Sequence, residues 1–94
     1  MTQVTVYTKP WCPYCGRATN LLKRREIEFT EIDVSSDSRR ENEMKGLSQA
    51  HTVPQIFIGD TNLGGSDDLL AAEKSGLLDS LLNKTAEPET LLDT

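Results

Sequence analysis

The sequence predicts an α/β fold in which a four-stranded mixed sheet is flanked by helices, in the order β-α-β-α-β-β-α. Short apolar runs that suit strands alternate with segments whose apolar residues recur at helical spacing. The length of 94 residues is enough for one compact domain and too small for two. We therefore expect one domain over residues 1–83 and an acidic, flexible tail over residues 84–94.

The first half of the chain predicts a strand, a helix and a second strand. Residues 3–8 alternate apolar and polar side chains, which is typical of a strand. From Pro13 to about residue 25, apolar residues recur at i, i+4, i+7 and i+8, and a proline is well tolerated in the first turn of a helix. Residues 28–33 predict a second strand whose apolar residues fall on both faces, a pattern that a parallel strand covered on both faces would explain. Because a helix joins these two strands, we expect them to pair in parallel.

The second half predicts further helices around a hairpin. Ser38 and Glu41 have the spacing of a capping box for a helix to about residue 45, and Gly46 is a natural stop. Residues 55–58 form an apolar strand, and the turn over residues 59–62 leads into its hairpin partner. Ser66 is the expected cap of the next helix, and the leucines after Gly76 predict a final one.

Composition narrows the classes of function. The net charge of −5 and the isoelectric point near 4.7 argue against a nucleic-acid partner, because phosphate binding needs a basic face. No apolar stretch approaches the length of a membrane span, and residues 1–4 do not resemble the start of a signal peptide. We expect a cytoplasmic monomer with no membrane partner.

The chain has two cysteines, Cys12 and Cys15. A structural disulfide that closed so short a loop would restrict the unfolded chain little. A zinc site would need further ligands, and His51 is the only histidine. We therefore expect no metal site and no tightly bound cofactor. In a reducing compartment, this spacing indicates redox chemistry.

The Cys-Pro-Tyr-Cys motif lies where the first strand ends and the first helix begins. Thiolates attack disulfides and thiols do not, and a helix N-terminus favours a negative sulfur. Lys9 adds a nearby positive charge. Cys12, at the helix entrance, is therefore the predicted nucleophile. Cys15 lies one turn inside the helix and is the predicted resolving thiol, with the higher pKa of the two.

Three separated blocks resemble the glutaredoxin family, and the resemblance extends over about residues 3–83. They are Tyr-Thr-Lys-Pro-Trp-Cys-Pro-Tyr-Cys at 7–15, Thr-Val-Pro at 52–54 and Gly-Gly-Ser-Asp-Asp-Leu at 64–69. The Pro-Tyr pair is typical of dithiol glutaredoxins, and the third block separates glutaredoxins from thioredoxins. Some bacterial relatives carry a third cysteine where this chain has Ser66.

The resemblance implies a thioredoxin-like fold and a glutathione-disulfide oxidoreductase with glutathione as co-substrate. The implied partners are disulfide-containing or glutathionylated proteins, among them ribonucleotide reductase. An alternative within the family is a [2Fe–2S] carrier whose cluster is bound through Cys12 and glutathione. A third hypothesis is an electron donor recharged by thioredoxin reductase, against which the Pro-Tyr pair and the third block argue.

The resemblance also implies where glutathione binds. Pro54 is expected to be cis, with the backbone of Thr52 and Val53 pairing with the cysteinyl part of glutathione like a short added strand. The backbone N–H groups of Ser66 and Asp67, at a helix start, are expected to hold the γ-glutamyl carboxylate.

Other side chains are expected to complete this glutathione site. The carboxylate of Asp67, or that of Asp68, would take the amino group of glutathione. Gly65 allows a close backbone approach at the turn before the helix. The remaining implied contacts are Lys9 and Arg40 for the glycyl carboxylate, and Tyr14 beside the sulfur.

Overall fold

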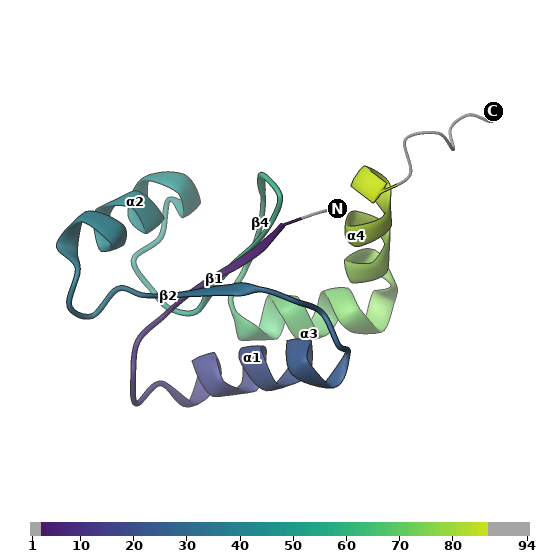
Figure 1. The fold of residues 1–94 in the computed structure, drawn as a ribbon, viewed down its shortest axis with the longest axis horizontal. Coiled ribbons are helices and arrows are strands. Elements are labelled where there is room, and N and C mark those ends of the chain that lie inside the picture. The colour runs from purple at the N-terminus through teal and green to yellow at the C-terminus, as the bar shows by residue number, and fades with distance from the viewer. Residues whose placement is uncertain (1–2, 87–94) are drawn as a thin grey trace.

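Four strands form one mixed sheet in the order β2-β1-β3-β4 (Figure 1). The chain is described by a computed structural model over residues 3–86. β1 pairs in parallel with β2, as predicted, and β3 pairs antiparallel with both β1 and β4. The strands are β1 (Val4–Thr8), β2 (Thr30–Asp33), β3 (Gln55–Ile58) and β4 (Thr61–Gly64).

Helices cover both faces of this sheet (Figure 1). α2 lies on one side, and α1 and α3 lie on the other, with α4 following α3 at the end of the sheet away from the start of α1. The predicted thioredoxin-like arrangement is confirmed, and a separate final helix follows Gly76, as expected. The helices are α1 (Pro13–Arg24), α2 (Ser38–Ser48), α3 (Ser66–Ser75) and α4 (Leu77–Ala86).

Alternation along β3 divides the core in two. Ile56 and Ile58 point to the face covered by α1, α3 and α4, while Phe57 points to the face covered by α2. The larger cluster contains Leu22 of α1 and Leu69 of α3. Because α1 is fixed to the sheet by this buried face, its N-terminus occupies one defined position beside the end of β1.

The ends of α2 differ from the prediction. Its N-cap is Asp37 rather than Ser38, and the Asp37 carboxylate accepts the backbone N–H groups of Arg39 at 3.1 Å and Arg40 at 3.2 Å. The helix continues through Gly46 and ends before Gln49, which has a left-handed φ of 59°. A glycine can adopt helical dihedrals as well as the left-handed ones of a stop, so its position alone did not determine the end.

The C-terminal boundary of the domain also lies further along the chain than expected. α4 continues to Ala86, so the first three residues of the predicted tail belong to a helix. Residues 87–94 of that tail lie outside the described residues. Within residues 3–86, no helix has the length and apolar character needed to cross a membrane.

The core predicts a sharp contrast between two leucines in helices. Leu22 is 0% exposed, so Leu22→Ala should lower the free energy of unfolding by about 3 kcal/mol through lost burial and a cavity. Leu47 on α2 is 58% exposed, and Leu47→Ala should change it by about 0.5 kcal/mol or less. Urea unfolding followed by circular dichroism measures both. Equal losses would contradict the assigned core.

Candidate functional site

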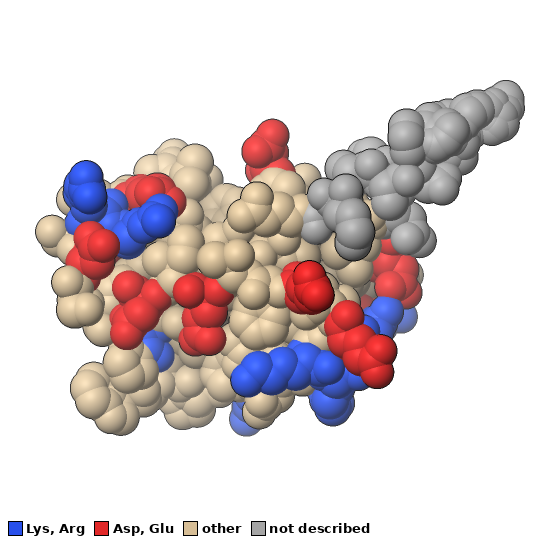
Figure 2. Space-filling view, viewed as in Figure 1, with Lys and Arg blue, Asp and Glu red and all other residues tan. Residues whose placement is uncertain are grey.

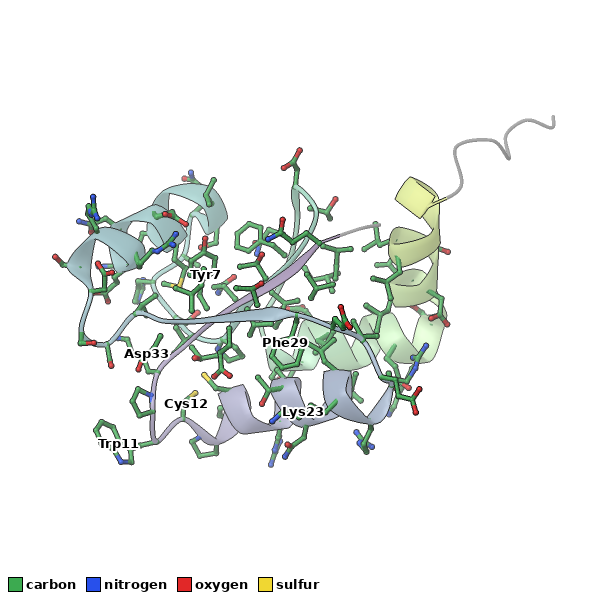
Figure 3. The ribbon with its side chains drawn as sticks, viewed as in Figure 1. Tyr7, Trp11, Cys12, Lys23, Phe29 and Asp33 are labelled. Atoms are coloured by element: carbon green, nitrogen blue, oxygen red, sulfur yellow. The ribbon has the colours of Figure 1, made fainter. Side chains whose placement is uncertain are left out.

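Cys12 is the N-cap residue of α1, immediately after the loop that follows β1 (Figure 3). Its sulfur accepts the backbone N–H of Cys15 at 3.3 Å, as capping oxygens do in other helices. Pro13 is the first helical residue, where its fixed φ starts the helix at no cost in hydrogen bonds. The sulfur is partly exposed and lies at the N-terminal end of the helix, where the first backbone N–H groups lack intrahelical partners.

Cys15 has a different environment one turn along α1. It is 4% exposed, and both cysteines are free thiols. Burial raises the pKa of the Cys15 thiol to about 12, and its hydrogen bond to Cys12 and the nearby Cys12 charge act in the same direction. Cys15 is therefore a neutral thiol near pH 7.

The loop before β3 faces the Cys12 sulfur. The Val53–Pro54 peptide bond is cis, as the resemblance implied. The Cys12 thiol donates to the carbonyl oxygen of Val53 across 3.8 Å. The side-chain amide of Gln55 donates to the carbonyl oxygen of Thr52 at 3.1 Å, which fixes the loop from behind.

Gln55 is a supporting residue that the sequence analysis did not identify. Its side chain is buried, and Asn62 of β4 donates to its amide oxygen at 3.2 Å. A lone glutamine at the start of an apolar strand gives no signal of this role. Only the need of a buried side-chain amide for hydrogen-bond partners could indicate it.

The Gly-Gly turn brings the start of α3 beside the cis-proline loop. Gly64 has a φ of 108°, and a side chain there would collide with the Asp68 carboxylate. That carboxylate accepts the backbone N–H of Gly65 at 2.9 Å. A Cβ on Gly65 would lie 3.6 Å from the carbonyl oxygen of Pro54, which shows how near the two segments are.

The cap of α3 is Gly65, and the expected capping residue, Ser66, is instead the first helical residue. Ser66 is not needed as the cap because the Asp68 carboxylate reaches back and accepts the backbone N–H of Gly65. The N–H groups of Ser66 and Asp67 belong to the first turn, where backbone donors lack intrahelical partners. The Asp68 carboxylate is thus engaged with the backbone, and the neighbouring Asp67 is exposed.

The two cations expected at the glycyl carboxylate, Lys9 and Arg40, form ion pairs with residues of α2. The Lys9 amine lies 3.4 Å from a carboxylate oxygen of Glu41. The Arg40 guanidinium lies 3.1 Å from Glu43, which also accepts a hydrogen bond from the hydroxyl of Tyr7 at 2.6 Å. Burial, followed by this hydrogen bond, raises the pKa of Tyr7 to about 12.

The two aromatic residues flanking Cys12 are both exposed. Tyr14 is 53% exposed, and the Arg17 guanidinium lies 5.2 Å from the centre of its ring. Trp11 is 93% exposed and projects away from the rest of the molecule (Figure 3). Its backbone has a left-handed φ of 61°. The structure therefore brings together Cys12, Cys15, Tyr14 and the two predicted binding segments, and it directs Arg40 toward Glu43.

The side chains that could bind a metal ion are dispersed in the part of the chain that the structure describes. No three His, Cys, Asp or Glu side chains gather there in a group that could hold a metal ion. A cluster carrier of the kind considered above would take its other ligands from glutathione and a second subunit.

Comparisons with known proteins point to one family. The glutaredoxin family model matches residues 4–62. A glutaredoxin from Pseudomonas aeruginosa is 46% identical over 83 residues, which are 88% of this chain and 99% of that protein. The solution structure of a glutaredoxin from Brucella melitensis is 52% identical, with a TM-score of 0.76 over 87% of this chain and 89% of that one. The crystal structure of a buckwheat glutaredoxin–glutathione complex has a TM-score of 0.79 at 23% identity, over 88% and 78% of the two chains, and this likeness concerns the fold.

The different environments of the two thiols predict selective alkylation. At pH 8, a thiol with a pKa of about 12 is thiolate in roughly one molecule in ten thousand, so Cys15 should resist iodoacetamide while Cys12 reacts. Intact-mass and peptide mass spectrometry should find one adduct, on Cys12. Two adducts should form in denaturant, and two adducts on the native protein would contradict the assignment.

Proposed function

Because the chain belongs to the glutaredoxin family, we propose that it is a cytoplasmic, glutathione-dependent thiol–disulfide oxidoreductase that reduces protein disulfides and glutathione mixed disulfides. The observation that carries the proposal is the position of the Cys12 sulfur. It is partly exposed at the start of α1, between the cis-Pro54 loop and the buried thiol of Cys15.

Reduction of a glutathione mixed disulfide uses Cys12 alone. The Cys12 thiolate attacks the glutathione sulfur, a bond forms between them, and the client sulfur leaves as a thiolate that takes a proton from solvent. The thiolate of a second glutathione then attacks the bound glutathione sulfur. Oxidised glutathione leaves, and Cys12 is again a thiolate. One glutathione thiol is consumed and leaves joined to the glutathione that had been bound to the client, and one client thiol is released reduced.

Reduction of a protein disulfide also needs Cys15. Cys12 attacks one client sulfur, and the second client sulfur leaves as a thiolate. The Cys15 thiol gives up its proton and its sulfur attacks Cys12, which releases the reduced client and leaves a Cys12–Cys15 disulfide. Two glutathione molecules then restore both thiols. The Cys12 charge is one cause of the raised pKa of Cys15, so bonding of Cys12 to the client removes that contribution at the step where Cys15 must ionise.

Glutathione fits a position that spans the three segments around Cys12. Its cysteinyl backbone would pair with Thr52 and Val53 beside cis-Pro54, and its γ-glutamyl carboxylate would accept the N–H groups of Ser66 and Asp67. Asp67 is exposed and can receive the amino group. The glycyl end would lie toward Lys9, and Arg40 would reach it only by leaving Glu43.

Single-cysteine variants test the reaction. Cys15→Ser should keep most of the reduction of a glutathionylated peptide and lose at least about ten-fold of the reduction of a protein disulfide, because no resolving thiol remains. Cys12→Ser should lose both. The measurement is NADPH consumption coupled through glutathione reductase, with thioredoxin reductase substituted as the control. Activity that survives in Cys12→Ser would overturn the proposal.

The pairing of Lys9 with Glu41 predicts an effect on glutathione affinity. If Lys9 binds the glycyl carboxylate, Glu41 competes for the same amine, 3.4 Å away. Glu41→Gln should therefore lower KM for a glutathionylated peptide by about two- to five-fold, with kcat unchanged, since the competing interaction is a surface ion pair.

The matched control for that substitution is Asp60→Asn. It makes the same change in net charge at the exposed turn between β3 and β4 (Figure 1). It should leave KM unchanged. An equal fall in KM in both variants would show a general charge effect, and an unchanged KM in Glu41→Gln would remove Lys9 from the proposed site.

A further inference from the structure

A groove of about 610 Å³ runs between α1 and the start of α3. It borders the proposed glutathione site, because Ser66 and Asp67 belong to its wall. The rest of its lining includes Arg17, Lys23 and Arg24 of α1 and Leu70 of α3. The groove therefore continues past the first turn of α3, along the C-terminal two thirds of the helix that begins at the reactive cysteine.

Charge is unevenly distributed around this groove. α1 contains the three cations Arg17, Lys23 and Arg24 and no acidic residue, in a chain of net charge −5. Among the described residues, no salt bridge joins any of the three, whereas Arg25, just after the helix, is paired with both Glu73 and Asp79. Figure 2 shows Lys and Arg side chains along the edge of the molecule where α1 lies.

We propose that this groove binds an acidic segment of the protein client, next to the client's reacting cysteine. The inference rests on the proposed function, since it concerns the clients of Cys12. Unpaired cations on one wall provide charge complementarity to carboxylates, and such complementarity acts mainly on the rate and selectivity of encounter.

The dimensions suit a short polypeptide segment. From Arg17 to Arg24, the part of α1 that lines the groove rises about 10 Å, which an extended chain covers in about three residues. Arg17 lies over the Tyr14 ring at the end nearest Cys12, and Arg24 is the last residue of the helix. Glutathione, held by the start of α3, would leave the part of the groove along Lys23 and Arg24 open.

Peptides of matched length test the charge preference. Each would carry one glutathionylated cysteine followed by five residues that are mainly acidic, neutral or basic. At low ionic strength, kcat/KM should be at least about five-fold higher for the acidic than for the basic peptide, and the difference should shrink in 0.5 M salt. Equal kcat/KM for the three peptides would overturn the proposal.

Charge reversal locates the preference. Arg24→Glu should bring the acidic peptide to within about two-fold of the basic one, and Arg24→Lys should retain the preference. Arg39→Glu is the matched control, because Arg39 is an exposed arginine on α2, on the opposite face of the sheet (Figure 1). It should leave the preference intact. Loss of the preference in both Glu variants would overturn the assignment to the groove.

Two further readouts separate this inference from the proposed function. Turnover of the mixed disulfide of glutathione and 2-mercaptoethanol tests the function and should be the same in the wild type and Arg24→Glu. Fluorescence anisotropy of a labelled acidic peptide without cysteine tests the groove, even in an inactive protein. Binding to the wild type and not to Arg24→Glu supports the groove. A DNA oligonucleotide of equal charge that binds as tightly would overturn a polypeptide occupant.

Discussion

The sulfur of Cys12 caps its own helix, and the rest of the site depends on this interaction. A capping atom must lie close to the first free N–H groups of α1, and here the sulfur lies 3.3 Å from the N–H of Cys15. The position of that end is fixed from the other side, because Leu22 and its neighbours bury α1 against the sheet. The stability of the core and the geometry of the nucleophile are thus two consequences of the same packing.

The topology of the sheet brings the other two segments to this point. β3 lies antiparallel beside β1, with Gln55 opposite Tyr7, so the residues before β3 meet the residues after β1. This register places Val53 and cis-Pro54 across from Cys12. The hairpin then returns the chain, and the left-handed Gly64 turns it so that α3 starts beside Pro54. Three segments distant in sequence therefore surround one sulfur.

Short sequence patterns predicted the strands, helices and turns whose formation depends on neighbouring residues. The strand after residue 3, the helix begun by Pro13 and the hairpin after Ile58 follow from periodicity and turn chemistry, and the structure confirms them. The predicted start of α2 was wrong because Asp37 and Ser38 are both residues that can cap a helix. In the structure, the Asp37 carboxylate accepts the first backbone N–H groups. The cis state of Pro54 came from the family resemblance, since the residues around it do not distinguish the two isomers.

The pairing of Lys9 with Glu41 could not be predicted, because it depends on how the segment after β1 lies against α2. The Arg40–Glu43 pair is different, since its members are three residues apart on one helix. Lys9 and Arg40 appear in the sequence as free cations, yet α2 supplies a carboxylate to each. The three cations of α1 have no salt bridge among the described residues, a state they share with Arg39 of α2 and Lys74 of α3, but they are the ones that line the groove. A thiolate that attacks a disulfide in an anionic partner must approach against like charge, and unpaired cations one to three turns from Cys12 offset that repulsion. Positive charge without a salt-bridge partner lies on the helix that begins at the nucleophile. It therefore favours the approach of acidic clients, even though the chain itself has a net negative charge.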